Sequence, residues 1–260
     1  MASERRLTAS ALRARKGLRF PVITAYDAPF ARCAEAAGID VILVGDSLGM
    51  VVLGYSSTVP VELDDMLRHG AAAARGTSRA HIIVDMPFGS YEASDEHAVR
   101  SAVALVKAGG ATSVKLEGGV RAAARIRAIV GAGIPVVAHI GVLPQTAGHD
   151  LGFRRRAERD DLIADARAIA EAGASAVVLE MVDAELAGEI TSALKIPTIG
   201  IGSGSKCDGQ VLVLHDVLGL FPDPPPFAKR FVDLADVTTR ALREYAESVR
   251  GGTFPAEHTT

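Results

Sequence analysis

The sequence predicts a single-domain (β/α)8 barrel, and three observations support this prediction. Short runs rich in valine and isoleucine alternate with longer alanine-rich stretches along the chain. Such continuous apolar runs are typical of strands buried on both faces of a parallel sheet. The chain has 260 residues, and a barrel of this kind takes about 250. An open doubly wound sheet is the alternative, although no Gly-x-Gly-x-x-Gly motif follows the first run. We therefore expect one domain over residues 1–260.

Eight runs are expected to be strands. They are Phe20–Ala25, Asp40–Val44, His81–Val84, Thr112–Leu116, Pro135–Ala138, Ala176–Leu179, Pro197–Ile201 and a weaker run, Gln210–Leu214. Helical patterns lie between them, and the clearest are Pro29–Ala37, Ser94–Ala108, Asp160–Ala172 and Asp183–Leu194. Ser94 and Asp183 are residue types that cap helix N-termini, and glycines that follow an Ala-Ala or Lys-Ala pair stop the helices before the next strand. The repetition indicates βα units.

The two ends of the chain are expected to be helical as well. Leu7–Leu18 is predicted to be a helix that plugs the bottom of the barrel. Phe227–Val249 is predicted to form one or two closing helices.

Composition excludes several classes of function. The formal net charge is −3 and tryptophan is absent, so neither nucleic acid nor an anionic membrane is an expected partner. No run of apolar residues is long enough to span a bilayer. The two cysteines, Cys33 and Cys207, are too few for a disulfide framework. We therefore expect a cytoplasmic protein that acts on small molecules.

Ionisable residues follow the predicted strands, where barrel active sites lie. They are Tyr26 and Asp27, Asp46 and Ser47, Asp85, Lys115 with Glu117, His139 and Glu180. Five of these residues are carboxylates, which repel one another when they are brought together without a counter-ion. A divalent cation that prefers oxygen ligands, such as Mg²⁺, removes that repulsion. Asp46 and Asp85 are the first metal-ligand candidates and Glu117 the next, while the other carboxylates act through water or as bases.

Each of these residues also has a purely structural interpretation. Asp27 alone is a typical helix N-cap. Lys115 and Glu117 share a strand face and could pair with each other. His139 alone could be a hydrogen-bonded core histidine. The joint placement at successive strand ends favours a functional interpretation of the set.

The same residues resemble the ketopantoate hydroxymethyltransferase family. The most specific phrase is Val44-Gly45-Asp46-Ser47-Leu48-Gly49-Met50. The others are Thr24-Ala25-Tyr26-Asp27, Asp85-Met86-Pro87-Phe88, Val114-Lys115-Leu116-Glu117-Gly118-Gly119, His139-Ile140-Gly141, Pro144-Gln145, Leu179-Glu180, Ile199-Gly200-Ile201-Gly202, Asp208-Gly209-Gln210 and His215-Asp216. They occur in the family's order from about Thr24 to Phe231.

The resemblance implies a barrel of the phosphoenolpyruvate/pyruvate superfamily and a Mg²⁺-dependent reaction. The family transfers a hydroxymethyl group from 5,10-methylenetetrahydrofolate to 3-methyl-2-oxobutanoate (2-oxoisovalerate), through a Mg²⁺-stabilised enolate. The product is 2-dehydropantoate (ketopantoate), a precursor of pantothenate and coenzyme A. The resemblance also implies a homo-oligomer, a decamer of two pentamer rings.

The resemblance implies roles for the residues at the strand ends. Asp46, Asp85 and Glu117 match the metal-site positions. Ser47, Asp85 and Lys115 match positions that contact the 2-oxo acid, and we expect Tyr26 and Asp46 to line the same pocket. Glu180 matches the proton acceptor, and His139 lies near the substrate. Lys115 and His139 are therefore expected to take part in catalysis with Glu180.

Some loop residues differ from the family pattern. Leu143 stands where a threonine is usual, Ser203 stands where an alanine is usual, and Asp150–Glu158 replaces a longer glycine-rich phrase. Because of these changes, one alternative is that the protein is a paralogue that hydroxymethylates a different 2-oxo acid. A carbon–carbon lyase of the same superfamily is another, although its Lys-Lys-Cys-Gly-His phrase is absent. A non-catalytic barrel is the third, and it would be expected to lack some of the residues that are present.

Overall fold

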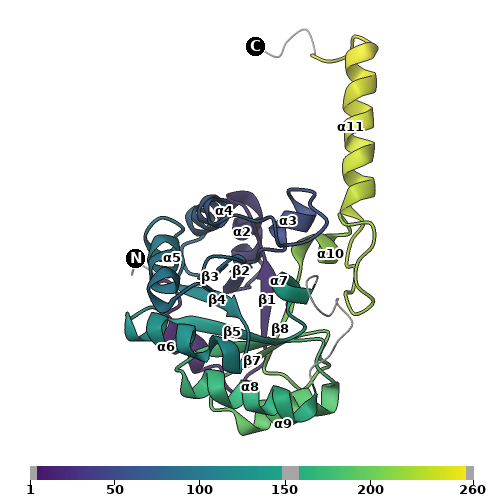
Figure 1. The fold of residues 1–260 in the computed structure, drawn as a ribbon. Coiled ribbons are helices and arrows are strands. Elements are labelled where there is room, and N and C mark those ends of the chain that lie inside the picture. The colour runs from purple at the N-terminus through teal and green to yellow at the C-terminus, as the bar shows by residue number, and fades with distance from the viewer. Residues whose placement is uncertain (1–4, 148–157, 256–260) are drawn as a thin grey trace. The chain divides into compact units, whose positions relative to one another are not determined.

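Residues 5–147 and 158–255 are described in a computed structural model, which contains a closed barrel of eight parallel strands. Each strand pairs with the next, and β8 pairs with β1 to close the barrel. In Figure 1 the strands form the centre, with helices such as α5, α6 and α8 outside them. The predicted (β/α)8 barrel is confirmed, and its closure excludes the open doubly wound sheet.

The strands are short and nearly all of their residues are buried. Their bounds are β1 Phe20–Thr24, β2 Val41–Val44, β3 His81–Asp85, β4 Ser113–Glu117, β5 Val136–Gly141, β6 Ala176–Glu180, β7 Thr198–Ile201 and β8 Gly209–Leu212. Each overlaps a predicted strand. The largest difference is at β5, which runs on to Gly141 where the prediction ends at Ala138. This extension matters for the site, because it carries β5 alongside the end of β6.

Helices follow most strands and begin at the caps that the sequence indicates. Their bounds are α2 Ala28–Ala36, α3 Leu48–Val51, α4 Leu63–Gly76, α5 Asp95–Lys107, η1 Val120–Ala122, α6 Ala123–Gly131, α7 Pro144–Ala147, α8 Arg159–Glu171 and α9 Ala184–Ala193. Ser94 caps α5 by accepting a hydrogen bond from His97 N at 3.1 Å. Asp183 caps α9 in the same way. The sequence analysis did not delimit α4, which begins with a capping box at Glu62.

The N-terminal segment fills the bottom of the barrel. Helix α1 (Ala9–Arg13) places Leu12, which is fully buried, in the core cluster of strand side chains that includes Phe20 and Ile83. The helix is shorter than the predicted Leu7–Leu18. The backbone turns after it, and Gly17, at a φ of +80°, donates its N–H to Asp208 Oδ1 at 2.9 Å. Only glycine adopts that backbone conformation at no cost, so the helix ends before it.

His81 ties the N-terminal segment to the barrel. Its Nδ1 lies 2.9 Å from the backbone oxygen of Leu7, and its Nε2 lies 2.8 Å from Ser113 Oγ. Burial of the ring lowers the pKa of His81 to about 4. Between that value and the ordinary pKa of about 6.5, the unfolded chain binds a proton that the folded chain does not. Stability that is present above pH 6.5 is therefore lost as the pH falls towards 4.

We expect the wild-type protein to lose up to about 3 kcal/mol more stability than a His81→Asn variant between pH 7 and pH 4.5. Asparagine keeps a hydrogen-bonding group near Leu7 but does not titrate. Urea unfolding of both proteins, followed by circular dichroism over this range, measures the difference. Parallel pH profiles would show that His81 is not the titrating group.

The chain divides into two compact units, residues 1–213 and residues 214–260. The second contains α10 (Leu214–Leu218) and α11 (Leu234–Arg250). A helix is thus present in the predicted segment Phe227–Val249, although it begins seven residues later because Asp233 is its N-cap. That it closes the barrel, and that residues 1–260 form one domain, stay predictions. In the described part of the chain, no helix is long and apolar enough to cross a membrane.

Candidate active site at the mouth of the barrel

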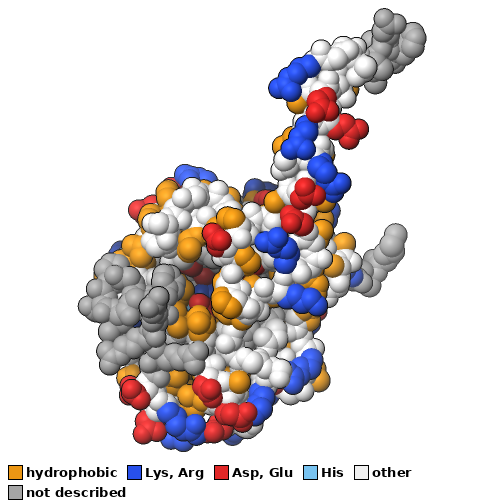
Figure 2. Space-filling view, turned by 90° about the vertical axis from the view of Figure 1, so that its right-hand side faces the viewer, with side chains coloured by type: hydrophobic (Ala, Val, Ile, Leu, Met, Phe, Trp, Pro, Cys, Tyr) orange, Lys and Arg blue, Asp and Glu red, His pale blue; other side chains and the backbone are white. Residues whose placement is uncertain are grey.

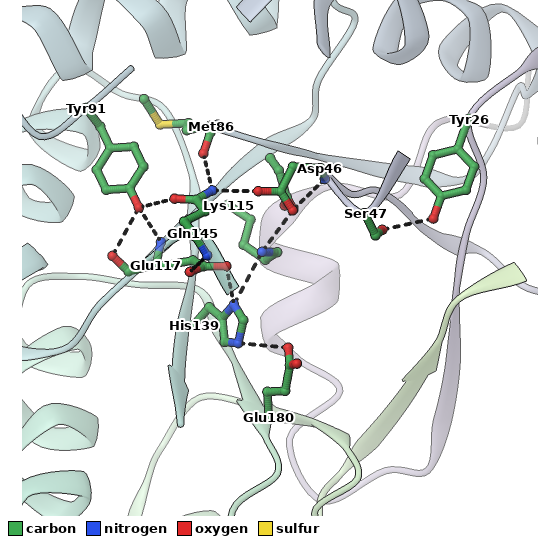
Figure 3. A network of polar contacts seen from close by, with 11 residues as sticks. Tyr26, Asp46, Ser47, Met86, Tyr91, Lys115, Glu117, His139, Gln145 and Glu180 are labelled. Atoms are coloured by element: carbon green, nitrogen blue, oxygen red, sulfur yellow. Dashed lines mark hydrogen bonds and ion pairs between the residues drawn. The ribbon is translucent and has the colours of Figure 1, made fainter. Parts of the chain in front are cut away.

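The strand register brings the predicted site residues together at the C-terminal mouth of the barrel. Asp85 on β3 pairs with Lys115 on β4, and Glu117 on β4 pairs with His139 on β5. Glu180 ends β6 opposite Gly141. Neighbouring strands lie about 4.8 Å apart, so side chains that end adjacent strands are within reach of one another. Figure 3 shows the resulting network, which runs from Tyr91 through His139 to Glu180.

Lys115 forms a buried ion pair with Asp85. Its Nζ lies 3.0 Å from Asp85 Oδ2, and the two side chains are 5% and 3% exposed. Burial lowers the pKa of Lys115, but the charges of Asp85, Glu117 and Asp46 outweigh burial and raise it. Lys115 is therefore a cation at neutral pH. The alternative in which Lys115 simply pairs with Glu117 is wrong, because the ion-pair partner lies on the neighbouring strand.

His139 links two carboxylates. Its Nδ1 lies 3.4 Å from Glu117 Oε1, and its Nε2 lies 3.2 Å from Glu180 Oε2. Burial and the charge of Lys115 lower the pKa of His139. The charge of Glu117 and hydrogen bonds to Glu117 and Glu180 outweigh these two effects and raise the pKa to about 9. The same contact with His139 holds the pKa of Glu117 below its usual value against the effect of burial. His139 thus lies between two acids, whose negative charges favour its protonated form.

Asp46, which follows β2, lies next to Asp85, which ends β3. The backbone N–H of Asp46 donates to Asp85 Oδ2 at 3.0 Å, and Asp46 Oδ2 accepts from Gln145 Nε2 at 2.8 Å. Burial raises the pKa of Asp46 well above its usual value, and the charges of Asp85 and Glu117 raise it further. Burial also raises the pKa of Asp85, although Lys115 opposes the shift. Both carboxylates would be stabilised in their ionised forms by a nearby cation.

The charge balance of the mouth fits a divalent cation. Its ionisable groups are four carboxylates and two bases: Asp46, Asp85, Glu117, Glu180, Lys115 and His139. When all are ionised, the formal charge is −2, which one divalent cation neutralises. Asp85 Oδ1 is buried without a hydrogen-bond partner, and a buried carboxylate oxygen of this kind is expected to have one. A cation at Asp85 Oδ1 would provide it.

Among the residues that the structure describes, no three His, Cys, Asp or Glu side chains converge closely enough to hold a metal ion on their own. Mg²⁺ needs only one or two carboxylates and takes its other ligands from water and substrate. Asp46 and Asp85 could supply those carboxylates, and Glu117 could act through water.

Tyr26 and Ser47 flank this cluster, but Asp27 does not belong to it. Tyr26 is buried and its hydroxyl lies 2.9 Å from Ser47 Oγ, next to Asp46 in sequence (Figure 3). Asp27 instead caps α2, because its Oδ1 accepts a hydrogen bond from Phe30 N at 2.8 Å. The structural interpretation of Asp27 is therefore the correct one, and the acidic cluster has four members where the strand ends indicate five.

Glu180 is the most accessible carboxylate of the mouth. Its side chain is 19% exposed, against 1% for Glu117. Figure 2 shows a hollow in the surface in which charged side chains lie between apolar ones. Ser203 fixes the backbone on both sides of Glu180, since its hydroxyl donates to Leu179 O at 2.7 Å and accepts from Val182 N at 3.0 Å. A residue that departs from the family pattern thus positions the end of β6.

Gly141 allows β5 to run close to Glu180. Its φ is +104°, and a Cβ at this position would lie 2.2 Å from the backbone oxygen of Glu180. No other residue type fits there without moving β6.

Two residues of the network, Tyr91 and Gln145, have no role predicted from the sequence, although Gln145 lies in one of the family phrases. Both are buried, and the Tyr91 hydroxyl donates to Gln145 Oε1 at 2.5 Å. Gln145 lies in α7, just after β5. Its position beyond the end of a strand could therefore have predicted a place at the mouth of the barrel. Tyr91 lies in a loop before α5, and no local pattern marks it. Most of Asp150–Glu158, the segment that differs from the family pattern, lies outside the described residues.

Solved structures share this architecture at low sequence identity. The chain is similar to 2,3-dimethylmalate lyase, a PEP mutase/isocitrate lyase superfamily member, with a TM-score of 0.62 and 18% identity, over 97% of this chain and 91% of that chain. It is also similar to phosphonopyruvate hydrolase in complex with oxalate and Mg²⁺, with a TM-score of 0.63 and 16% identity, over 97% and 90%. The chain is therefore a (β/α)8 barrel whose fold is similar to those of PEP mutase/isocitrate lyase superfamily members.

Sequence comparison identifies the family within that class. A family model described as ketopantoate hydroxymethyltransferase matches residues 6–257. A 3-methyl-2-oxobutanoate hydroxymethyltransferase from Ignicoccus hospitalis is 52% identical over 247 residues, which cover 94% of each chain. One of the same name from Chloroflexus aurantiacus is 55% identical over 251 residues, 94% of this chain and 89% of the relative. The chain belongs to the ketopantoate hydroxymethyltransferase family, which confirms the predicted family and enzyme class.

Proposed function

We propose that the protein transfers a hydroxymethyl group from 5,10-methylenetetrahydrofolate to 3-methyl-2-oxobutanoate and so forms 2-dehydropantoate for pantothenate synthesis. The observation that carries the proposal is whole-chain similarity to relatives of that name, with identities above 50%. The mouth supports it, because Asp46, Asp85, Lys115, His139 and Glu180 occupy one connected network. These groups suit the removal of a proton next to a ketone.

Each residue of the mouth has a proposed role. Asp46 and Asp85 hold a divalent cation, with Glu117 acting through water, and the 2-oxo acid binds beside them against Ser47, Tyr26 and Lys115. The cation, when bound, polarises the ketone and so acidifies the neighbouring C3–H bond. Glu180 removes the C3 proton. Lys115 places its positive charge near the oxygen on which the enolate charge develops, and His139 orients the carboxylate of Glu180.

The bond changes follow from these roles. The C3–H bond breaks and its proton goes to Glu180, while the electron pair forms the enolate. Water releases the methylene carbon from the donor as formaldehyde: both bonds from that carbon to folate nitrogens break, and the two nitrogens take up the protons of the water. C3 then forms a bond to the formaldehyde carbon, and the oxygen, which came from water, takes the proton from Glu180 to become the new hydroxyl group. A cavity of about 220 Å³ that borders Glu117 and Tyr91 lies beside this reaction centre, and Arg121 and Arg125 line it. Arg125 already pairs with Asp95, so Arg121 is the lining cation that would face a carboxylate of a folate.

The experiment that tests the proposal is hydrogen–deuterium exchange at C3, followed by NMR on a panel of 2-oxo acids with Mg²⁺. Samples with and without tetrahydrofolate and formaldehyde separate proton removal from carbon transfer. Mg²⁺-dependent exchange and hydroxymethylation of 3-methyl-2-oxobutanoate are expected. Activity on a different 2-oxo acid alone would replace the substrate with that of a paralogue. Retro-aldol cleavage would identify a lyase, and inactivity with every acid would favour a non-catalytic barrel.

We also propose that the protein is a cytoplasmic homo-oligomer. Helix α11 is consistent with self-association, because none of its residues is buried within its own unit, residues 214–260. Leu242, Tyr245 and Val249 lie three to four residues apart on it and are 62%, 56% and 45% exposed. Residues at this spacing share one helix face, and such a face is normally covered in a stable protein. The free thiols of Cys33 and Cys207 suit a reducing compartment.

A Leu242→Glu/Tyr245→Glu variant is expected to have a lower molar mass in solution than the wild type, because two charges would have to be buried in the contact between copies. Multi-angle light scattering measures the mass. Arg243→Ala is the matched control, since it changes an exposed polar residue of the same turn and should leave the mass unaltered. An unchanged mass in the double variant would exclude this face from the contact.

A further inference from the structure

Gln145 connects the ends of three strands, although it is neither charged nor part of a strand. It is fully buried in α7. Its Nε2 donates to Asp46 Oδ2 at 2.8 Å and to the backbone oxygen of Met86 at 2.9 Å. Its backbone N–H donates to Glu117 Oε2 at 3.1 Å. Asp46 follows β2, Met86 follows β3 and Glu117 ends β4. The side chain and backbone of Gln145 therefore connect the ends of three neighbouring strands at the acidic mouth.

Tyr91 holds the amide oxygen of Gln145, while two acceptors hold its NH₂ group. The Tyr91 hydroxyl donates its single proton to Gln145 Oε1 at 2.5 Å and accepts from the backbone N–H of Glu117 at 3.3 Å. Asp46 Oδ2 and the oxygen of Met86 are both acceptors, so only the NH₂ group of the amide can face them. A flipped amide would place oxygen against two oxygens and NH₂ against the phenol. The orientation in Figure 3 is therefore the one in which every hydrogen bond is satisfied.

These contacts leave one oxygen of each metal-site aspartate for a cation. Gln145 engages Asp46 Oδ2, while Lys115 and the backbone of Asp46 engage Asp85 Oδ2. Asp85 Oδ1 is buried and accepts no hydrogen bond. Because Gln145 is neutral, it restrains Asp46 without competing with a cation for the negative charge of the carboxylate.

We propose that Gln145 is a positioning residue for the divalent-cation site, and that Tyr91 acts through it by holding its amide oxygen in place. The inference rests on the cation site of the proposed function. Gln145 holds Asp46 and Glu117 at a set separation before the cation arrives, so binding does not have to order them. Outer contacts of this kind are typically worth about 10- to 100-fold in metal affinity.

Mn²⁺ binding measured by electron paramagnetic resonance tests the proposal without reliance on turnover. Gln145→Leu keeps the size of the side chain and removes the amide, and we expect it to weaken Mn²⁺ binding by about 10- to 100-fold. Tyr91→Phe removes only the hydroxyl and should weaken binding by a smaller factor. In the double variant, Tyr91→Phe should add almost nothing to the effect of Gln145→Leu, because the hydroxyl acts through the amide. Excess Mg²⁺ should restore much of kcat in each single variant.

The control is Ser113→Ala, which removes a buried hydrogen bond to His81 at the opposite end of the barrel. It should lower the thermal midpoint and leave Mn²⁺ affinity unchanged, which separates lost stability from lost positioning. Wild-type affinity in either folded single variant would overturn the proposal, as would additive losses in the double variant. A wild-type protein that binds no Mn²⁺ would instead refute the cation site of the proposed function. If Gln145→Leu does not fold, Tyr91→Phe alone decides.

Discussion

Glu180→Gln is expected to stop C3 proton exchange while the 2-oxo acid still binds. Glutamine has the same shape as glutamate but cannot accept the proton, and the loss of a positioned base typically costs about 10²- to 10⁴-fold in rate. Glu180 is the mouth carboxylate with the most exposed side chain, and its Oε2 lies 3.2 Å from His139. Glu180 is therefore accessible to a substrate and is oriented by His139. NMR exchange at C3, with calorimetric titration of the 2-oxo acid, measures the two properties separately.

Asp27→Asn is the matched control for this experiment. Asp27 is also a carboxylate at a strand end, but its side chain caps α2. Asparagine caps helices as well as aspartate does, so exchange at C3 should stay at the wild-type rate. If Glu180→Gln exchanged the proton as fast as the wild type, the base would have to be another residue of the mouth.

Asp85→Asn is expected to abolish the Mg²⁺-dependent part of 2-oxo acid binding. The substitution removes the charge from the residue whose Oδ1 is buried without a hydrogen-bond partner and whose Oδ2 pairs with Lys115. Breaking a buried ionic contact costs about 3–5 kcal/mol, which corresponds to a loss of binding between about 10²- and 10⁴-fold. Calorimetric titration of the 2-oxo acid with and without Mg²⁺ measures this loss.

The same substitution leaves Lys115 as an unpaired buried cation, so the protein should also lose stability. An Asp85→Asn/Lys115→Met variant removes both charges and should recover much of that stability. It should not recover Mg²⁺-dependent binding, because the metal-site carboxylate is still missing. Thermal unfolding and titration of the three proteins separate the two effects. Mg²⁺-dependent binding in the double variant would show that Asp85 is not a metal ligand.

The sequence by itself determined the order of the elements and the location of the site. Strand runs and glycine stops are local signals, because a parallel strand buried on both faces must be apolar along its whole length. The strand ends then indicated Asp46, Asp85, Lys115, His139 and Glu180, all of which lie at the mouth. The family phrase around Asp46 added a function that no periodicity contains.

The tertiary structure alone decided which of these residues touch. Lys115 pairs with Asp85 on the adjacent strand, because the barrel register sets that neighbour. Asp27 caps the helix that follows it. Its position after a strand in the sequence is equally compatible with a place in the mouth, so the sequence could not separate the two roles. Gln145 reaches Asp46, which is 99 residues away in sequence. Contacts between residues so far apart depend on how the barrel closes, and the local patterns in the sequence do not specify that closure.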